Sequence, residues 1–166
     1  MPKLVVMLAC LSAIPTVVAA QSASGVCDEA QAICVDSEPA SGGSVLKSVA
    51  DTPLQVCSIK PMTGWFRDGC CNTDDSDRGS HTICAKVTQA FLEYLRERGN
   101  DLITPVPQFG FPGLKDGDQW CVCAASWRQA HKAGAGCPVV LESTHAAALS
   151  IVPLEELMMH AIAEEV

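Results

Sequence analysis

Apolar side chains recur every four residues between positions 83 and 95, the spacing of one face of an α-helix. Ser80 precedes this stretch as a candidate N-cap, and Gly99 follows it as a C-terminal stop. We therefore predict a helix from about residue 81 to residue 98. A second helix is expected over 124–132, because this polar and apolar mixture ends in His131 and Lys132 just before Gly134.

Three short runs have strand character, at residues 54–57, 120–123 and 139–141. Ser143 or Thr144 is a candidate cap for a short helix over 146–149, and Pro153 with the two glutamates behind it predicts a final helix to about residue 163. Residues 100–119 are rich in Pro and Gly, which predicts a long ordered loop. The pattern predicts a single small α+β domain of short strands, about three helices and long loops.

The first 50 residues differ from the rest. Residues 1–20 combine Lys3, an apolar run broken by Pro15 and a small-residue end, which is the layout of a signal peptide. We expect entry into the secretory pathway and secretion; the alternative is a plastid address that begins with a signal peptide. Residues 21–50 are rich in Ser, Ala and Gly and predict a flexible leader. The cysteine-rich α+β domain then occupies 51–166.

Composition and charge narrow the classes of partner. Of 166 residues, 48% are hydrophobic, and 11 basic residues face 19 acidic ones. A packed core is expected, and a nucleic-acid partner is not, because there is no basic cluster to meet a phosphate backbone. No later apolar run is long enough to span a membrane, so we expect no stable span after signal cleavage.

Ten cysteines are the most distinctive feature of the composition. Signal cleavage removes Cys10, and the remaining 10 - 1 = 9 cannot all pair within one chain. Cys27 and Cys34 are close enough to form a local pair. In an oxidising compartment disulfides are the expected state of the others.

A zinc site is the second interpretation of the cysteines. His81 lies three residues before Cys84 at the start of the expected helix, a spacing that would place both on one metal. No standard finger spacing is present. The candidate metal ligands share their position at the ends of the expected elements; they are Cys70, Cys71, His81, Cys84, Cys121 and Cys123.

A reactive thiol is the third interpretation. Cys121 or Cys123 would be the reactive sulfur, and His145 or His81 its base. Cys84 in the first turn of the expected helix would have its thiolate favoured by the helix dipole, although a buried inert thiol explains it equally well. Asp74, Asp75 and Asp77 are read as a solvated loop, since the spacing of an EF-hand is absent. No nucleotide-binding or serine-hydrolase motif occurs.

Several motifs in fixed order resemble one family. The chain is similar to the uncharacterised family DUF2237, a domain of unknown function, over about residues 54–163. The motifs that carry this resemblance are the segments 64–71, 79–85, 98–102, 109–115, 117–124 and 141–145. The family implies no activity. It does imply that Cys57, Cys70, Cys71, His81, Cys84, Cys121, Cys123 and His145 belong to shared motifs, whereas Cys27, Cys34 and Cys137 are additions.

The sequence assigns no reaction and no substrate. Our leading hypothesis is a small soluble domain whose Cys/His cluster forms a structural metal or disulfide site, with zinc as the candidate metal. A thiol-dependent redox or nucleophilic enzyme is the first alternative. The second is a secreted, disulfide-stapled binding module that uses Trp65, Phe109 or Phe111 as its contact surface.

Overall fold

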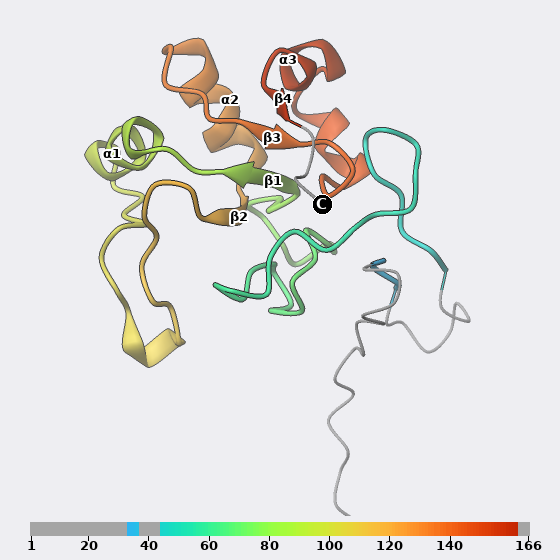
Figure 1. The fold of residues 1–166 in the computed structure, drawn as a ribbon, viewed down its shortest axis with the longest axis horizontal. Coiled ribbons are helices and arrows are strands. Elements are labelled where there is room, and N and C mark those ends of the chain that lie inside the picture. The colour runs from blue at the N-terminus through green and yellow to red at the C-terminus, as the bar shows by residue number, and fades with distance from the viewer. Residues whose placement is uncertain (1–32, 37–43, 163–166) are drawn as a thin grey trace, which may run out of the picture.

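The computed structural model describes residues 33–36 and 44–162, and its centre is a four-stranded mixed sheet with the strand order β2-β1-β3-β4 (Figure 1). The strands are β1 (Ile83–Lys86), β2 (Gln119–Val122), β3 (Val139–Val140) and β4 (Ala161–Ile162). β1 pairs antiparallel with both β2 and β3, and β4 pairs parallel with β3.

Three α-helices accompany the sheet, α1 (Gln89–Glu97), α2 (Ala124–Lys132) and α3 (Leu154–Met158). Two 3-10 helices lie in the connections, η1 (Pro107–Phe109) and η2 (Ala146–Ser150). The predicted α+β class is therefore confirmed.

The two faces of the sheet carry different chemistry, because successive side chains of a strand point to opposite sides. On one face, Ile83 and Ala85 of β1 join Val122 of β2 and the buried sides of α1 and α2 in the main hydrophobic core. On the other face, Cys84 and Cys121, which are register partners, belong to a separate buried cluster. The loop of residues 53–72 contributes the other cysteines of that cluster, so this loop covers the second face.

The first helix begins later than the sequence predicts. Its N-cap is Thr88, whose hydroxyl accepts a hydrogen bond from Phe91 N–H, and residues 83–86 form β1. Ser80 has φ 48° and does not cap a helix. The prediction was wrong here because β1 is buried on both faces, so its apolar residues do not alternate with polar ones and continue the helical spacing of α1.

Some of the other predicted elements are present in the structure, and some are shorter or absent. α2 has the predicted bounds, and β2 and β3 occupy two of the three predicted strand positions. Residues 54–57 make only isolated bridges, such as Gln55 with Ile33. The final helix ends at Met158 instead of continuing to residue 163, and the chain then returns to the sheet as β4. His145, not Ser143 or Thr144, caps the short helix η2.

The predicted signal peptide at 1–20 lies outside the described residues, as does Cys27. Two parts of the predicted leader are described, and both pair with the domain: Ile33 bridges Gln55, and Ser48 bridges His145. The flexible leader stays a prediction for the rest of the segment. Among the described residues, no helix combines the length and apolar character needed to cross a membrane.

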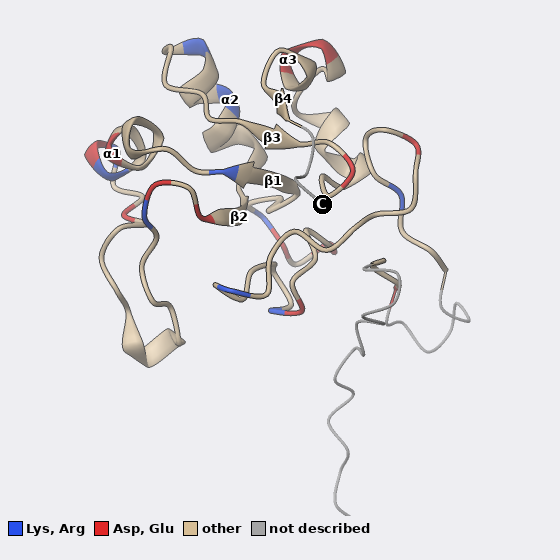
Figure 2. Ribbon diagram, viewed as in Figure 1, with Lys and Arg blue, Asp and Glu red and all other residues tan. Residues whose placement is uncertain are grey.

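Charged side chains are spread over the loops and helices, with basic and acidic positions interleaved (Figure 2). The best-formed ion pair joins α2 to α3, where the Arg128 guanidinium donates to both carboxylate oxygens of Glu156 at 2.8 and 2.9 Å. This pairing holds the short third helix against the second. The prediction that nucleic acid is not a partner remains a prediction.

The hydrophobic core between the helices and the sheet should contribute much of the free energy of unfolding. Phe91 of α1 is fully buried in the main core. We expect Phe91→Ala to lower the free energy of unfolding by about 3–5 kcal/mol, through lost apolar contact and the cavity left behind. Urea titration with the disulfides intact measures this. Met159→Ala is the control, because Met159 is 75% exposed and its truncation should change the stability by less than about 0.5 kcal/mol.

Candidate functional site

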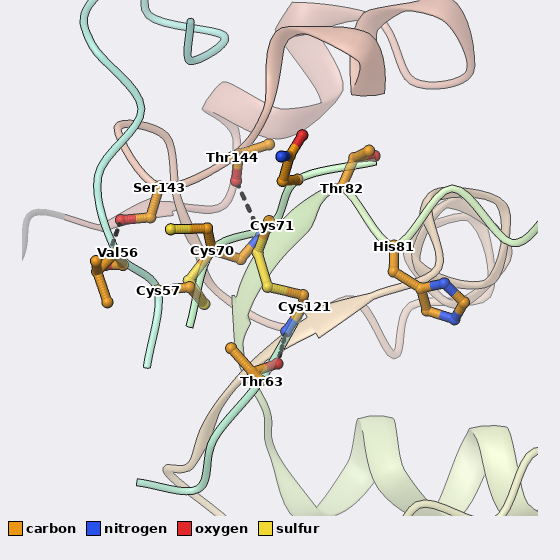
Figure 3. The surroundings of a disulfide bond; sticks show 12 residues. Val56, Cys57, Thr63, Cys70, Cys71, His81, Thr82, Cys121, Ser143 and Thr144 are labelled. Carbon is orange, nitrogen blue, oxygen red and sulfur yellow. Dashed lines mark hydrogen bonds between the residues drawn. A yellow bond between two sulfur atoms is a disulfide. The ribbon is translucent and has the colours of Figure 1, made fainter. Parts of the chain in front are cut away.

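Two disulfides fasten the covering loop to the sheet, and a third joins the N-terminal segment to that loop. Cys57 is bonded to Cys84 of β1, and Cys71 to Cys121 of β2, so the edge strand β2 and its neighbour β1 are both tied to the loop. The third disulfide joins Cys34 to Cys70, which corrects the expected local pair of Cys27 with Cys34. Figure 3 shows Cys57, Cys70, Cys71 and Cys121 grouped beside the strands.

Two of these disulfides are packed against each other. The sulfur atoms of Cys57, Cys71 and Cys121 all lie within 4.8 Å of one another, and Cys84 is bonded to the first of them. We call Cys57, Cys71, Cys84 and Cys121 the four-cysteine cluster. Each member is at most 4% exposed, and the side chains of Val140 and Ile162 pack against the cluster.

Buried threonines fix the backbone around this cluster. The Thr63 hydroxyl oxygen accepts a hydrogen bond from Cys121 N–H at 2.8 Å, and that of Thr144 accepts one from Cys84 N–H at 3.1 Å (Figure 3). Thr144 in turn donates to the carbonyl of Val140 at 2.8 Å. The paired strands β1 and β2 are thus held by hydroxyl groups as well as by disulfides.

The six cysteine and histidine residues predicted as metal ligands are divided among three places. Cys71, Cys84 and Cys121 lie in the four-cysteine cluster, and Cys70 is bonded to Cys34 in a separate hydrophobic cluster with Leu54. His81 points away from the labelled cysteines in Figure 3, and it lines a cleft together with Cys123. Cys84 is in a strand and in a disulfide, so the expected thiolate at a helix N-terminus was wrong.

A cleft of about 350 Å³ opens beside β2, between the Gly64–Arg67 turn and the 100–111 loop. Its lining includes Cys121 and Cys123 from the end of β2 and His81 from the segment before β1. The hydrogen bond from Ala124 N–H to the Ser80 carbonyl, 3.0 Å long, joins the residue after Cys123 to the residue before His81. The cleft therefore brings together a thiol, an imidazole and one end of a disulfide.

Asp77 fixes the orientation of the His81 ring. Its Oδ1 lies 2.7 Å from Nδ1 of His81, and its Oδ2 accepts hydrogen bonds from His81 N–H and the Thr73 hydroxyl. Burial opposes ionisation of this carboxyl, but the hydrogen bonds from His81 and Thr73 outweigh it and lower the pKa of Asp77. The prediction that Asp77 is solvated in a loop was wrong, because its side chain is fully buried.

Two free thiols remain among the described cysteines, and they differ in accessibility. Cys123 is partly exposed and is the N-cap residue of α2, with no capping hydrogen bond from its side chain. Cys137 is fully buried in the main core, and this burial raises the pKa of its thiol to about 12. Cys123 is therefore the described thiol that is placed to react.

His145 has a structural role. Its Nδ1 accepts a hydrogen bond from Ala147 N–H at 3.0 Å, which caps η2, and burial lowers its pKa. It does not line the cleft described above. Of the two predicted bases, only His81 shares the cleft with a predicted sulfur.

Aromatic rings and one cation form the rest of the cleft. Trp65 stacks on the His81 ring at a centroid distance of 5.7 Å, and the Arg67 guanidinium lies 4.9 Å from the Trp120 ring centre. Phe111 contacts Trp120 edge-on, whereas Phe109 is 76% exposed. The residues of the expected contact surface therefore line the same cleft, with Trp65 on one wall and Phe109 and Phe111 on the other.

Sequence reasoning missed three of the residues that shape this site. Arg67 and Thr63 lie in a loop with no periodicity, and their contacts with Trp120 and Cys121 depend on the tertiary fold. Asp77 had a local signal, since it precedes His81 by four residues, but acidic loop residues are usually solvated.

Comparison with protein-family models gives a match. A family model described as "Uncharacterized protein conserved in bacteria (DUF2237)" matches residues 47–161. No curated protein matches the chain. The matched range contains the cleft, the four-cysteine cluster and the whole sheet except Ile162.

The disulfide pattern gives a direct test of the site. Proteolysis of the unreduced protein followed by mass spectrometry should yield peptides cross-linked through the pairs Cys34–Cys70, Cys57–Cys84 and Cys71–Cys121. Cys123 and Cys137 should appear as alkylated monomers after denaturation. A Cys121–Cys123 cross-link would contradict the arrangement.

The Asp77 carboxylate should make stability depend on acidity. Because its folded pKa lies below the unfolded value of about 3.9, its contribution is complete above that value and is lost as the pH falls through the folded pKa. Asp77→Asn should therefore destabilise the protein by about 1–3 kcal/mol near neutral pH and by much less in acid. Urea titrations at about pH 6 and about pH 2 measure the difference, with exposed Asp75→Asn as the control.

Proposed function

The chain belongs to the DUF2237 family, which assigns no activity, and from the cleft geometry we propose that it is a thiol-dependent enzyme in which Cys123 is the nucleophile. The domain itself is an uncharacterised one with three disulfides and a buried group of cysteines. The observation that carries the proposal is that an unbonded thiol shares a cleft with a histidine held by a buried carboxylate.

Each of the three groups has a role in this proposal. Cys123 supplies the sulfur, at the positive end of the α2 dipole. His81 takes the thiol proton on Nε2, since its Nδ1 faces Asp77. Asp77 positions the ring and stabilises the imidazolium that forms, which is the division of labour found in nucleophile, base and acid arrangements generally.

The lining of the cleft favours a small acyl substrate with a planar apolar part. Trp65, Phe111 and Trp120 supply flat apolar surface, and Arg67 supplies a cation that a carboxylate or carbonyl oxygen can pair with. Cys123 Sγ would add to the acyl carbon, His81 would return the proton to the leaving group, and water would hydrolyse the thioester.

Alkylation kinetics test the nucleophile and its base. In the native protein at about pH 7, iodoacetamide should modify Cys123 well before Cys137, because burial keeps the Cys137 thiol protonated and inaccessible. His81→Gln and Asp77→Asn should slow the modification of Cys123 by about tenfold or more. Mass spectrometry of the cysteine peptides gives the rates.

His145→Gln is the control, because His145 lies outside the cleft lining and a glutamine oxygen can still cap η2. It should leave the Cys123 rate unchanged. Equal rates for Cys123 and Cys137, or an unchanged Cys123 rate in His81→Gln, would contradict the proposal.

Incubation with a small aromatic thioester should in addition leave an acyl group on Cys123, and Cys123→Ser should abolish turnover while the ligand still binds. Binding of the aromatic ligand without acylation would instead indicate a binding module.

A further inference from the structure

We propose that the four-cysteine cluster is also a metal site: once reduced, Cys57, Cys71, Cys84 and Cys121 bind one thiolate-preferring divalent ion such as Zn²⁺. The same four sulfur atoms would then hold either two disulfides or one ion. This inference does not depend on the reactivity of Cys123, which lies outside the cluster.

The sulfur positions are close to what a tetrahedral ion requires. Zinc–thiolate bonds of about 2.3 Å place the sulfur atoms of a four-thiolate site about 3.8 Å apart. The sulfur atoms of Cys57, Cys71 and Cys121 already lie within 4.8 Å of one another. The fourth sulfur, that of Cys84, is bonded to the Cys57 sulfur. Reduction frees each bonded pair to separate, and the proposed site requires that rotation about the Cα–Cβ bonds then brings the Cys84 sulfur to the centre of the other three.

The backbones that carry the ligands are held by more than the disulfides. Cys84 and Cys121 are Cα partners in the β1–β2 ladder, which supplies two ligands from a rigid pair of strands. Cys57 N–H donates to the Gly69 carbonyl at 2.8 Å, and Cys121 N–H donates to Thr63. The first of these hydrogen bonds closes the covering loop on itself and the second fastens that loop to β2, and neither requires oxidised sulfur.

The surroundings suit a closed thiolate site. All four cysteines are buried, and Val140 and Ile162 keep water from the sulfur atoms. Cys121 also lines the cleft, which gives an ion a route from solvent to the cluster. Soft sulfur ligands in tetrahedral arrangement select zinc and related ions over magnesium or calcium.

A dithiol can supply the electrons that convert the two disulfides into four metal-binding thiols. Two dithiol molecules each become a cyclic disulfide, and they reduce the Cys57–Cys84 and Cys71–Cys121 bonds to four thiols. The ion then replaces four protons, which are released to solvent. Oxidation of the four thiolates by a disulfide of the same class would expel the ion and restore the two bonds.

Metal titration of the reduced full chain tests the site. The protein is reduced with excess dithiothreitol, freed of reductant without air, and titrated with Co²⁺ and then with Zn²⁺. We expect one Co²⁺ per chain with the visible spectrum of a tetrahedral thiolate complex, its displacement by Zn²⁺, and four fewer thiols open to alkylation in the zinc form. Circular dichroism should show a folded zinc form.

Variants separate this cluster from the other cysteines. Cys71→Ser and Cys84→Ser should each weaken binding at least about tenfold. The double variant Cys34→Ser/Cys70→Ser, which removes the disulfide outside the cluster, should still bind one ion. Cys123→Ser should also bind one ion, and this result separates failure of the metal site from failure of the proposed enzyme. Absence of Co²⁺ binding in the reduced chain, a zinc form that stays unfolded, or unchanged binding in Cys71→Ser would each overturn the proposal.

Discussion

The attachment of a long irregular loop to one face of the sheet is the constraint on which the rest of the structure depends. Residues 53–72 contain only isolated bridges, and yet they form the second layer of the domain. Such a loop has little regular hydrogen bonding to hold it. The disulfides from Cys57 to β1 and from Cys71 to β2 supply that fixation, and the hydroxyl of Thr63 adds to it.

The cleft is a product of this attachment. Because Cys71 is tied to Cys121, the turn that carries Trp65 and Arg67 is held close to the end of β2, where Trp120 and Cys123 lie. The opposite wall comes from the 100–111 loop. One covalent bond thus places an apolar wall, a cation and a thiol around a shared space, while the core behind the sheet is packed independently by the helices.

Local signals in the sequence were enough to predict α2, β2 and β3, because each has a composition typical of its element and a Gly or Pro near one end. They were not enough for β1, since burial on both faces removed the alternation that identifies a strand. The cysteines showed the same limit. Their concentration pointed to a site, but Cys84 and Cys121, which face each other in the sheet register, bond to Cys57 and Cys71 of the covering loop and not to each other. Pairing therefore depends on how the loop folds over the sheet, and spacing along the chain does not contain that information.

The adjacent residues Cys70 and Cys71 bond in opposite directions along the chain, the first back to Cys34 and the second forward to Cys121. The bond from Cys57 to Cys84 spans the junction between them. Every peptide bond from Cys34 to Cys121 is therefore enclosed by at least one covalent ring. A single backbone nick anywhere in that stretch would leave both fragments joined, so one proteolytic cut between Cys34 and Cys121 would release no part of the oxidised protein.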